Sequence, residues 1–451
     1  MQVRFGTDGI RAVANTELTP ELTMQVGKAF AFLLKNQFPN NLEKPKLVIG
    51  KDSRISSDLL VQACSAGILS MGIDVTIAGL VPTPAIAYLT KEKNFIGGIM
   101  ISASHNPFYD NGIKLFNAEG LKLSVSMEKT IEDFIANNNH PLAIAESAQI
   151  GHLHPGDKEK ECYITYLKEL IGTDLCGLHL IIDCANGAAS RIAPHVLRDL
   201  GADVTVLNAQ PDGININDKC GSTYPAVIRS AVLSKGAHIG FAFDGDADRL
   251  IAVDENGDLV DGDTQLYILA EYMKRKNLLQ KNTVVATVLS NLGLEQSLNK
   301  LGITVKRTPV GDRYIAQEMF EKGYNLGGEQ SGHILLRDHA STGDGLLTAL
   351  KLLHIVKETG ETLSQLSKNL SKTPQYMHNV RVQNTSCWQH DTEIANVIKE
   401  VEEELQSKGR VLVRASGTEP LIRILIEGEE SEALENYAKK IAEVITCSCC
   451  S

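Results

Sequence analysis

The sequence predicts an α/β protein made of three similar mixed α/β-layer domains followed by a smaller α+β domain. Its 451 residues exceed what one hydrophobic core organises, which is roughly 250–300 residues. Short β-type runs alternate with helical patterns in three successive series, an order typical of α/β layers. The pattern then changes near residue 371. We place the domains at 1–153, 154–254, 255–370 and 371–451, with limits in polar segments rich in turn-forming residues.

The first domain combines strand-like runs with a helix between the first two of them. The helix carries Leu59, Leu60 and Ile68, whose spacing puts them on one face. Its strand-like runs are KLVIG (46–50), DVTIAG (74–79) and FIGGIMIS (95–102).

Two further series repeat this alternation. The second has a helix near 189–200, and its strand-like runs are LHLIIDCA (178–185), DVTVLN (203–208) and HIGFAFD (238–244). The third has a helix from about 345 to 357, and its runs are NTVVATVL (282–289), GITVKRTP (302–309) and NLGGEQSGHILL (325–336). No repeat of fixed period accompanies this order, so the likeness among the domains lies in their architecture.

The fourth domain has a different composition of elements. Its strand-like runs are NVRVQN, RVLVRAS and LIRILIEG. Two segments, TEIANVIKEVEEELQS and SEALENYAKKIAEVI, have apolar residues at three- and four-residue spacing and predict amphipathic helices. This mixture indicates an α+β domain.

Composition and charge exclude several classes of protein. The formal net charge of -11 argues against a protein that binds nucleic-acid backbones through a basic face. The chain shows no basic segment followed by an apolar one at its start, and no apolar run nears the roughly 18 residues of a membrane span. The nine cysteines are scattered and odd in number, as expected of free thiols. We therefore expect a cytoplasmic protein with no nucleic-acid or membrane partner.

The segment FAFDGDADRL places Asp244, Asp246 and Asp248 at alternate positions after an apolar run. Three carboxylates this close repel one another unless a cation compensates, and hard oxygen ligands suit Mg²⁺. Two alternatives are a solvated acidic turn and an EF-hand Ca²⁺ loop with Glu255 as its twelfth residue. The sixth EF-hand position requires glycine, but here it is Arg249, which argues against the Ca²⁺ loop. Three carboxylates carry one charge more than the ion needs, and Arg249 beside them suggests that an anion such as phosphate binds in the same place.

The segment RVLVRASGTEPLIRI predicts a strand, a loop and a strand. Guanidinium groups, hydroxyls and the exposed amides of a glycine-containing loop together form a phosphate cradle, and the alternative is a hairpin with exposed arginines. The candidate residues are Arg414, Ser416, Gly417, Thr418 and Arg423.

The segment GGEQSGHILL brings Glu329, Ser331 and His333 into one loop between glycines. A carboxylate and a hydroxyl suit the hydroxyls of a sugar, and a histidine can act as acid or base; a purely structural loop is the alternative. Two turns are weaker candidates, FGTDGIRA with Arg11 and PVGDRY at 309–314. We interpret the second as structural unless the fold places it in a cleft.

The segment ISASHNPFYDNGIK (101–114) contains two candidate nucleophiles, Ser102 and Ser104. Its small polar residues and proline also predict a turn. The chain has no GxSxG elbow, which excludes a typical serine hydrolase of the α/β type. A serine facing an aspartate cluster favours phosphoryl transfer instead, with Lys114 for charge stabilisation or proton transfer.

Four segments occur in the order SASHNP, DGDADR, GEQSGH and RASGTEP. In this combination the sequence resembles the α-D-phosphohexomutase superfamily. FGTDGIR, VGDRY and the glutamine of GEQSGH make it most similar to the bacterial phosphoglucosamine mutase branch. The resemblance implies three similar α/β layers and a TATA-binding-protein-like α+β domain, which agrees with the pattern above.

The resemblance also implies roles for the candidate residues. Ser104, and not its neighbour Ser102, would carry a phosphoryl group and join the three aspartates in holding Mg²⁺. Lys114 and His333 would be the catalytic proton-transfer residues. Arg11 and Arg249 would be further catalytic residues that assist at the catalytic phosphate. The substrate-binding residues would be Glu329 and Ser331 at sugar hydroxyls, and Arg414, Ser416, Gly417, Thr418 and Arg423 at the phosphate that does not react.

The activity implied by the resemblance is that of an isomerase, an intramolecular phosphotransferase of UDP-N-acetylglucosamine biosynthesis. It would interconvert glucosamine 6-phosphate and glucosamine 1-phosphate through a phosphoserine and a 1,6-bisphosphate. Its partners would be the hexosamine phosphate and a hexose 1,6-bisphosphate activator, and a homodimer is compatible with the sequence. The alternatives are a phosphomannomutase or phosphoglucomutase, a simple phosphatase, and a non-catalytic sugar-phosphate-binding protein.

The metal loop departs from the family at one position. Ala247 stands where the family usually has glycine. If the backbone φ angle there is positive, alanine costs about 1 kcal/mol or more, and we expect the site to form with slightly different geometry.

Overall fold

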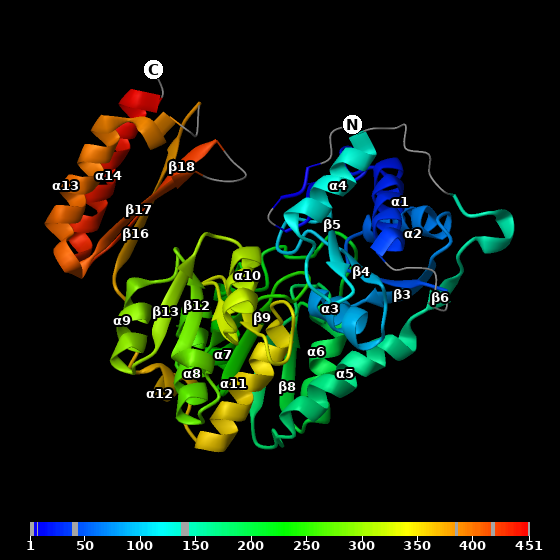
Figure 1. Ribbon diagram of the computed structural model, residues 1–451. Coiled ribbons are helices and arrows are strands. Elements are labelled where there is room, and N and C mark those ends of the chain that lie inside the picture. Colours follow the sequence, from blue (N-terminus) through cyan, green and yellow to red (C-terminus); the bar gives the residue numbers. More distant parts are fainter. Residues whose placement is uncertain are drawn as a thin grey trace. The chain divides into compact units, whose positions relative to one another are not determined.

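The computed structural model describes residues 4–6, 8–37, 44–136, 144–383, 387–415 and 420–449 (Figure 1). They form two compact units. Unit 1 contains Met1–Thr287 and Lys306–Ser367, and unit 2 contains Val288–Val305 and Lys368–Ser451.

The first sheet of unit 1 has the strand order β1-β5-β4-β2-β3-β6. Helices α1, α2 and α4 gather on one side of it and α3 and α5 on the other (Figure 1). β4 is buried along its whole length, as expected of a strand covered on both faces. The strands are β1 (Ile10–Val13), β2 (Lys46–Lys51), β3 (Asp74–Leu80), β4 (Gly97–Ile101), β5 (Asp110–Asn117) and β6 (Leu153–Pro155). The helices are α1 (Pro20–Gln37), α2 (Ser57–Leu69), α3 (Thr83–Glu92), α4 (Val125–Ala136) and α5 (Asp157–Ile171).

Strand β5 was not predicted from the sequence. It begins with the turn-forming residues Asp110, Asn111 and Gly112, which hide its strand character. β5 lies antiparallel to both β4 and β1, and a Cβ at Gly112 would come 2.5 Å from the Ser102 carbonyl oxygen. The glycine therefore lets β5 fit between its neighbours, and the segment with the two serines becomes the connection of a β4–β5 hairpin.

The second sheet has the order β11-β10-β9-β7-β8. β7 pairs parallel with β8 and β9, whereas β10 runs antiparallel to β9. The aspartate segment is therefore the connection of a β9–β10 hairpin, and its flanks are strands, unlike the helices of an EF-hand. The elements are β7 (His179–Asp183), α6 (Ala189–Asp199), β8 (Asp203–Leu207), α7 (Ala226–Lys235), β9 (Ile239–Phe243), β10 (Leu250–Val253) and β11 (Leu259–Val260).

The third sheet has the order β13-β12-β14-β15. The sequence segment 325–336 forms two antiparallel strands and not one run, so that residues 329–333 connect them. The strands are β12 (Thr283–Thr287), β13 (Thr304–Thr308), β14 (Leu326–Gly328) and β15 (Ile334–Leu336). The helices of this region are α8 (Gly262–Arg275), α10 (Asp312–Lys322), α11 (Gly345–Thr359) and α12 (Leu363–Ser367). Helix α9 (Leu292–Lys300) belongs to unit 2.

Unit 2 contains an antiparallel sheet of order β16-β18-β17. Ile422, Ile424 and Ile426 of β18 are fully buried and share a core with Val401 and Ile441 of the two helices. This alternation along the strand is what a half-buried sheet requires, and it confirms the predicted α+β domain. The elements are β16 (Gln375–Arg381), α13 (Thr392–Leu405), β17 (Arg410–Ala415), β18 (Leu421–Glu427) and α14 (Ser431–Cys449). Short 3₁₀ turns complete the chain at Ser147–Gln149, Gln280–Asn282, Cys387–His390 and Gln406–Lys408.

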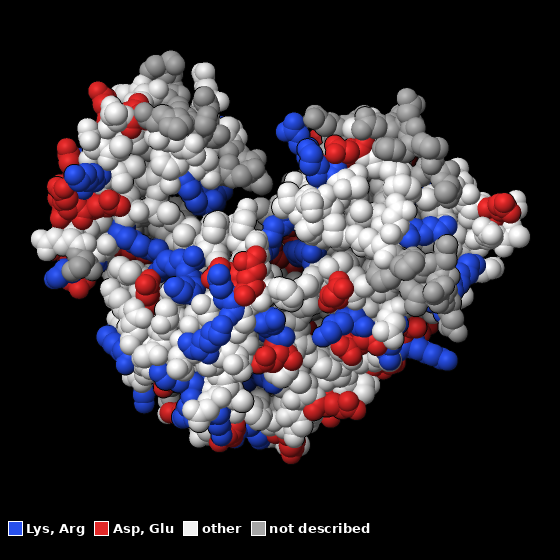
Figure 2. Space-filling model, in the orientation of Figure 1, with Lys and Arg blue, Asp and Glu red and all other residues white. Residues whose placement is uncertain are grey.

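The surface carries both signs of charge. Figure 2 shows basic and acidic side chains interspersed over the visible face. Among the described residues, no helix combines the length and the apolar character needed to cross a bilayer. Six cysteines are described as free thiols: Cys64, Cys162, Cys176, Cys184, Cys220 and Cys447.

Candidate active site

The β9–β10 connection gathers the three predicted aspartates into one buried cluster. Asp244, Asp246 and Asp248 each offer an oxygen atom within 4.8 Å of the others. Burial and then the two neighbouring carboxylates raise the pKa of Asp244 well above its usual value. One oxygen of Asp246 and one of Asp248 are buried without a hydrogen-bond partner in the described structure. Buried carboxylate oxygens without donors are costly unless a cation binds them, so this cluster has the character of a metal site.

The backbone of this loop is strained at the alanine singled out from the sequence. Ala247 has a φ angle of 56°, so the condition attached to its cost is met. The loop also lies very close to its neighbours. A Cβ at Gly245 would lie 2.6 Å from the Ser104 carbonyl oxygen, and Ala188 N–H donates to the Gly245 carbonyl at 2.8 Å. The β9–β10 connection therefore packs closely against the β4–β5 connection that carries Ser104.

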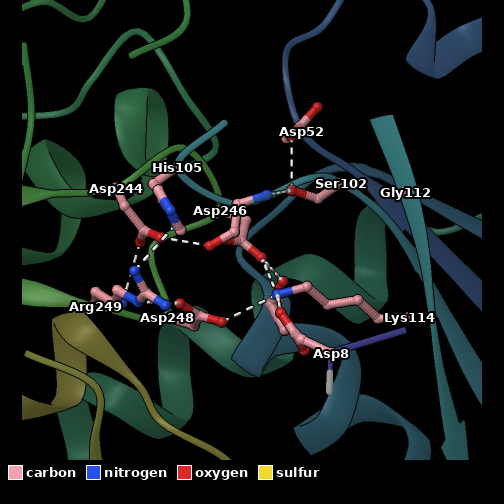
Figure 3. Close-up of polar contacts among 12 residues, drawn as sticks. Asp8, Asp52, Ser102, His105, Gly112, Lys114, Asp244, Asp246, Asp248 and Arg249 are labelled. Carbon is pink, nitrogen blue, oxygen red and sulfur yellow. Dashed lines mark hydrogen bonds and ion pairs between the residues drawn. The ribbon is translucent and has the colours of Figure 1, made fainter. Parts of the chain in front are cut away.

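The two serines have different environments. Ser104 Oγ donates to Asp244 Oδ2 at 2.7 Å, which joins it to the aspartate cluster. Ser102 Oγ instead accepts the Ser104 N–H at 2.9 Å and donates to Asp52 Oδ2 at 2.7 Å (Figure 3). Ser104 has a φ angle of 53°, a conformation that persists only when surrounding contacts enforce it. Ser104 is therefore the serine that faces the cluster, and Ser102 supports its backbone.

Arg54 and Asn217 enforce this conformation, and sequence reasoning missed both. The buried guanidinium of Arg54 donates to the carbonyl oxygens of Ser104, Asn106 and Asp110, each at 2.9 Å, and also to that of Pro107. Asn217 Nδ2 donates to the same Ser104 carbonyl at 2.9 Å. A sequence signal for Arg54 existed, because charged residues directly after the apolar strand β2 stand at the carboxyl edge of a parallel sheet, where sites form.

Lys114 reaches the aspartate cluster from β5. Its Nζ lies 2.8 Å from Asp246 Oδ2, 3.0 Å from Asp248 Oδ2 and 3.0 Å from Asp8 Oδ2, and Figure 3 shows it pointing between them. Burial alone would lower the pKa of Lys114, but the three carboxylates raise it well above its usual value. The side chain is therefore a buried ammonium beside the cluster.

Arg249 and His105 border the cluster on another side (Figure 3). Arg249 N–H donates to Asp244 Oδ1 at 3.1 Å, and its Nη1 lies 3.0 Å from His105 Nδ1. Burial and the nearby Arg249 and Arg11 lower the pKa of His105 to about 4, so this imidazole is neutral at neutral pH. Arg11 pairs with Asp8. These cations give an anion bound at the cluster several charge-assisted donors.

The loop between β14 and β15 brings His333 to the cluster and leaves its other two candidate residues, Glu329 and Ser331, beside α10. His333 Nδ1 lies 3.7 Å from Asp248 Oδ1. Burial by itself would lower the pKa of His333, but the Asp248 carboxylate raises it above its usual value. Glu329 Oε1 accepts the Gly311 N–H at 3.1 Å, and Ser331 Oγ donates to Glu329 Oε2 at 3.2 Å.

Unit 2 contains the described part of the predicted phosphate cradle. Arg414 of β17 and Arg423 of β18 are directly opposite each other in the sheet. Burial and the charge of Arg423 lower the pKa of Arg414. Like charges in directly opposed strand positions are destabilising, and a bound anion would relieve this repulsion. Ser416, Gly417 and Thr418 lie outside the described residues.

Comparison with known proteins accounts for almost the whole chain. Four families described as phosphoglucomutase/phosphomannomutase domains match it, α/β/α domain I at residues 2–141, domain II at 161–257, domain III at 261–373 and the C-terminal domain at 377–444. Phosphoglucosamine mutases of Halalkalibacterium halodurans and Caldicellulosiruptor bescii are 48% and 49% identical to it, over 441 and 445 residues and 98% of each chain.

Solved structures share the fold at low sequence identity. A phosphoglucomutase/phosphomannomutase family protein from Burkholderia thailandensis has a TM-score of 0.81 at 22% identity, over 98% of this chain and 97% of that one. Aspergillus fumigatus N-acetylphosphoglucosamine mutase, in complex with GlcNAc-6P and magnesium, has a TM-score of 0.71 at 16% identity, over 99% and 96% of the chains. The chain belongs to the phosphoglucomutase/phosphomannomutase family, as its four sequence motifs predicted.

Proposed function

We propose that this protein is a phosphoglucosamine mutase, an isomerase that interconverts glucosamine 6-phosphate and glucosamine 1-phosphate. The observation that carries the proposal is the 2.7 Å contact between Ser104 Oγ and Asp244 Oδ2. It aims one hydroxyl at a buried carboxylate cluster in which one oxygen of Asp246 and one of Asp248 lack donors. Relatives named phosphoglucosamine mutase, at 48% identity over 98% of both chains, support the choice of sugar.

The reaction follows from two phosphoryl transfers in opposite directions. The phosphoryl group on Ser104 passes to the free hydroxyl of the bound sugar phosphate: the bond from phosphorus to Ser104 Oγ breaks, a bond to the sugar oxygen forms, and the hydroxyl proton leaves to a base. The resulting 1,6-bisphosphate then reorients in the site, so that its other phosphoryl group faces Ser104. Its other phosphoryl group then returns to Ser104, and the second sugar oxygen regains a proton. Phosphorus and protons balance over the cycle, so no net phosphate is released.

Mg²⁺ is the cation we propose for the cluster. Three carboxylates and a serine oxygen are a hard ligand set, and the donor-free oxygens of Asp246 and Asp248 fit a cation. When bound, the ion would neutralise charge on the phosphoryl oxygens. Ser104, Asp244, Asp246 and Asp248 would hold it.

The remaining residues around the cluster have chemistry suited to the transfer. Lys114, a buried ammonium, and Arg249 and Arg11 would stabilise the negative charge of the phosphoryl group. His333, whose imidazole can take or return a proton near neutral pH, would serve the sugar hydroxyl. The raised pKa of Lys114 favours an electrostatic over a proton-accepting role for it.

Other residues would bind the parts of the substrate that do not react. Glu329 and Ser331 would accept and donate hydrogen bonds to sugar hydroxyls. Arg414, Ser416, Gly417, Thr418 and Arg423 would hold the second phosphate.

We also keep the domain limits near 153, 254 and 370 as a proposal. A cytoplasmic location fits the free thiols of the described cysteines.

A substrate panel tests the proposed function. The enzyme, phosphorylated beforehand with glucose 1,6-bisphosphate and supplied with Mg²⁺, is assayed with the 1-phosphates of glucosamine, glucose and mannose. We expect the highest kcat/KM for glucosamine 1-phosphate. A kcat/KM for glucose or mannose phosphate equal to or above that for glucosamine phosphate would contradict the sugar assignment. Release of inorganic phosphate in place of isomerisation would instead identify a phosphatase.

A further inference from the structure

The first two residues of α10, Asp312 and Arg313, make two ion pairs with the part of the chain around the first sheet. From the sequence, their segment PVGDRY is interpreted as structural unless the fold places it in a cleft. Asp312 pairs with Lys122, just beyond β5, and Arg313 pairs with Glu128 of α4. The side chains of all four are at most 16% exposed. Asp312 and Arg313 thus pair with two separate partners. The pair of Asp312 and Lys122 is the one that connects, through further ion pairs, to the aspartate cluster.

Lys122 and Asp312 belong to a closed ring of alternating charges. Lys122 also pairs with Asp8, and Asp8 Oδ2 lies 3.0 Å from Lys114 Nζ. Lys114 Nζ lies 3.0 Å from Asp248 Oδ2.

His333 closes this ring between Asp248 and Asp312. Its Nδ1 lies 3.7 Å from Asp248 Oδ1 and its Nε2 lies 3.6 Å from Asp312 Oδ2. Of the ring members, Lys122 is the cation that has no place in the four sequence motifs and no role in the proposed transfer.

We propose that Lys122 is a positioning residue: by holding Asp312 beside His333, it sets the orientation and tautomer of the His333 imidazole. The inference rests on the proposed function, in which His333 exchanges a proton with the sugar hydroxyl. Lys122 acts through Asp312 and does not itself touch the substrate.

The contacts of the imidazole explain why the charge on Asp312 must be compensated. The Gly343 N–H donates to His333 Nε2 at 3.2 Å. Nε2 is therefore an acceptor, and the proton of the neutral ring lies on Nδ1, toward Asp248. A carboxylate at 3.6 Å from Nε2 favours the opposite tautomer, because it attracts a proton to that nitrogen. The ammonium of Lys122 binds Asp312 and reduces this attraction.

The plane of the His333 imidazole has little freedom to adjust by itself. A Cβ at Gly343 would lie 2.5 Å from both Cε1 and Nε2 of His333, so the imidazole packs against the bare glycine. A change of tautomer breaks the Gly343 hydrogen bond, and the ring must then tilt within a tightly packed space. The orientation of His333 relative to Asp248 depends on the charge balance at Asp312.

The main chain holds Lys122 in a fixed place for this task. Lys122 bridges to Phe116, and Asn117 N–H donates to the Leu121 carbonyl at 2.9 Å. Ser341 Oγ donates to the Gly120 carbonyl at 2.6 Å. The turn that carries Lys122 is thereby tied to the loop that carries Gly343, and preorganisation of this kind is what a supporting shell provides.

The test compares Lys122→Met with Lys122→Arg. Loss of a residue that orients a catalytic group costs about 10- to 100-fold in activity. We expect Lys122→Met to lower kcat by that factor while KM changes less than about 3-fold, because proton transfer is a transition-state contribution. Lys122→Arg, which keeps the cation, should restore most of the activity. Unchanged kcat in Lys122→Met would overturn the proposal.

Glu128→Gln is the matched control. It breaks the neighbouring ion pair at the start of α10, at similar burial, but lies outside the ring. It should lower Tm and leave kcat within about 2-fold of the wild type, since the pair of Glu128 and Arg313 lies outside the ring of ion pairs that reaches His333. If Glu128→Gln lowers kcat as much as Lys122→Met does, the ring has no special role and the proposal fails.

A double-mutant cycle with Asp312→Asn separates the proposed route from general destabilisation. In the Asp312→Asn background, Lys122→Met leaves no unpaired carboxylate at position 312. We expect it to change kcat there by less than about 2-fold. A loss in this background as large as in the wild type would show that Lys122 acts by another route.

The ¹⁵N resonances of the His333 imidazole, assigned with His333→Gln, give a readout that needs no activity. We expect wild-type enzyme and Glu128→Gln to show the proton on Nδ1, and Lys122→Met to shift the pattern toward Nε2. Identical patterns in all three proteins would refute the inference. A wild-type enzyme that fails to isomerise glucosamine phosphates would instead refute the proposed function, and the resonances would still decide the role of Lys122.

Discussion

Ser104 and Ala247 both adopt the left-handed backbone region that L residues avoid, with φ angles of 53° and 56°. Both belong to loops that face each other across the candidate metal site. At Ser104 the strain has an evident use, because it aims Oγ at Asp244, and contacts from Arg54 and Asn217 hold it. Within the described part of the chain, no contact explains an advantage of alanine at position 247.

Ala247→Gly tests the cost of this strain. Glycine adopts positive φ freely, so the variant should gain about 1 kcal/mol in the free energy of unfolding, measured by urea denaturation. Ala188→Gly is the control: Ala188 is equally buried but has a φ angle of -66°, and glycine there should cost about 0.5–1 kcal/mol. A loss of stability in Ala247→Gly would show that the packing of the methyl group outweighs the strain.

The conformation of the β4–β5 connection depends on the guanidinium of Arg54, a residue outside that connection. Arg54 follows β2, yet it binds carbonyl oxygens of residues 104, 106, 107 and 110 and pairs with Asp52 at 2.8 Å. Backbone carbonyls buried without donors are costly. The loop is therefore shaped from a neighbouring strand, and its ability to present Ser104 belongs to the sheet as a whole.

Arg54→Met should destabilise this connection strongly. It leaves Asp52 buried without its cation, for which a loss of about 3–5 kcal/mol in the free energy of unfolding is expected. Arg54→Lys keeps the charge but not the planar fork and should lie between the two. Arg229→Met, at an arginine 54% exposed and 4.0 Å from its acidic partner, should change stability by less than about 0.5 kcal/mol. Equal effects at both arginines would contradict the account of the loop.

The residue that caps the start of helix α11, Asp344, makes the stability of the fold depend on pH. Asp344 accepts the Leu347 N–H at 2.9 Å and the Tyr163 hydroxyl at 2.7 Å, yet burial raises its pKa to about 6. The folded state thus holds this proton more tightly than the unfolded chain, whose value is near 3.8. Stability from this group is therefore present below about pH 4 and is lost as the pH rises through about 6.

Asp344→Asn keeps the cap acceptor and removes the titration. Urea denaturation at pH 4.5 and at pH 7.5 should show the wild type losing stability relative to the variant as the pH rises. If the difference between the two proteins is the same at both pH values, Asp344 does not titrate as described.

Across the whole molecule, the sequence predicted what lies in contiguous segments and missed what long-range contacts assemble. The three α/β series, the α+β domain and the aspartate cluster each depend on local patterns such as an apolar strand followed by carboxylates. The local pattern left Ser102 and Ser104 both open, and the preference for Ser104 came from the family resemblance. Strand β5 was missed because glycine and asparagine obscure it. Asn217 and Lys122 were missed because each is a single residue whose partners lie in distant segments, so that its role appears only in the assembled fold. Arg54 was missed although its place directly after an apolar strand was a signal.

The most direct test of the account follows one phosphoryl group. Enzyme carrying ³²P on Ser104, prepared with labelled glucose 1,6-bisphosphate, is mixed with excess unlabelled glucosamine 1-phosphate and Mg²⁺, and the products are separated after a single turnover. The account predicts that the label leaves the protein and appears in glucosamine 1,6-bisphosphate and glucosamine 6-phosphate, and that Ser104→Ala takes up no label. Label released as inorganic phosphate, or label incorporated into Ser104→Ala, would contradict it.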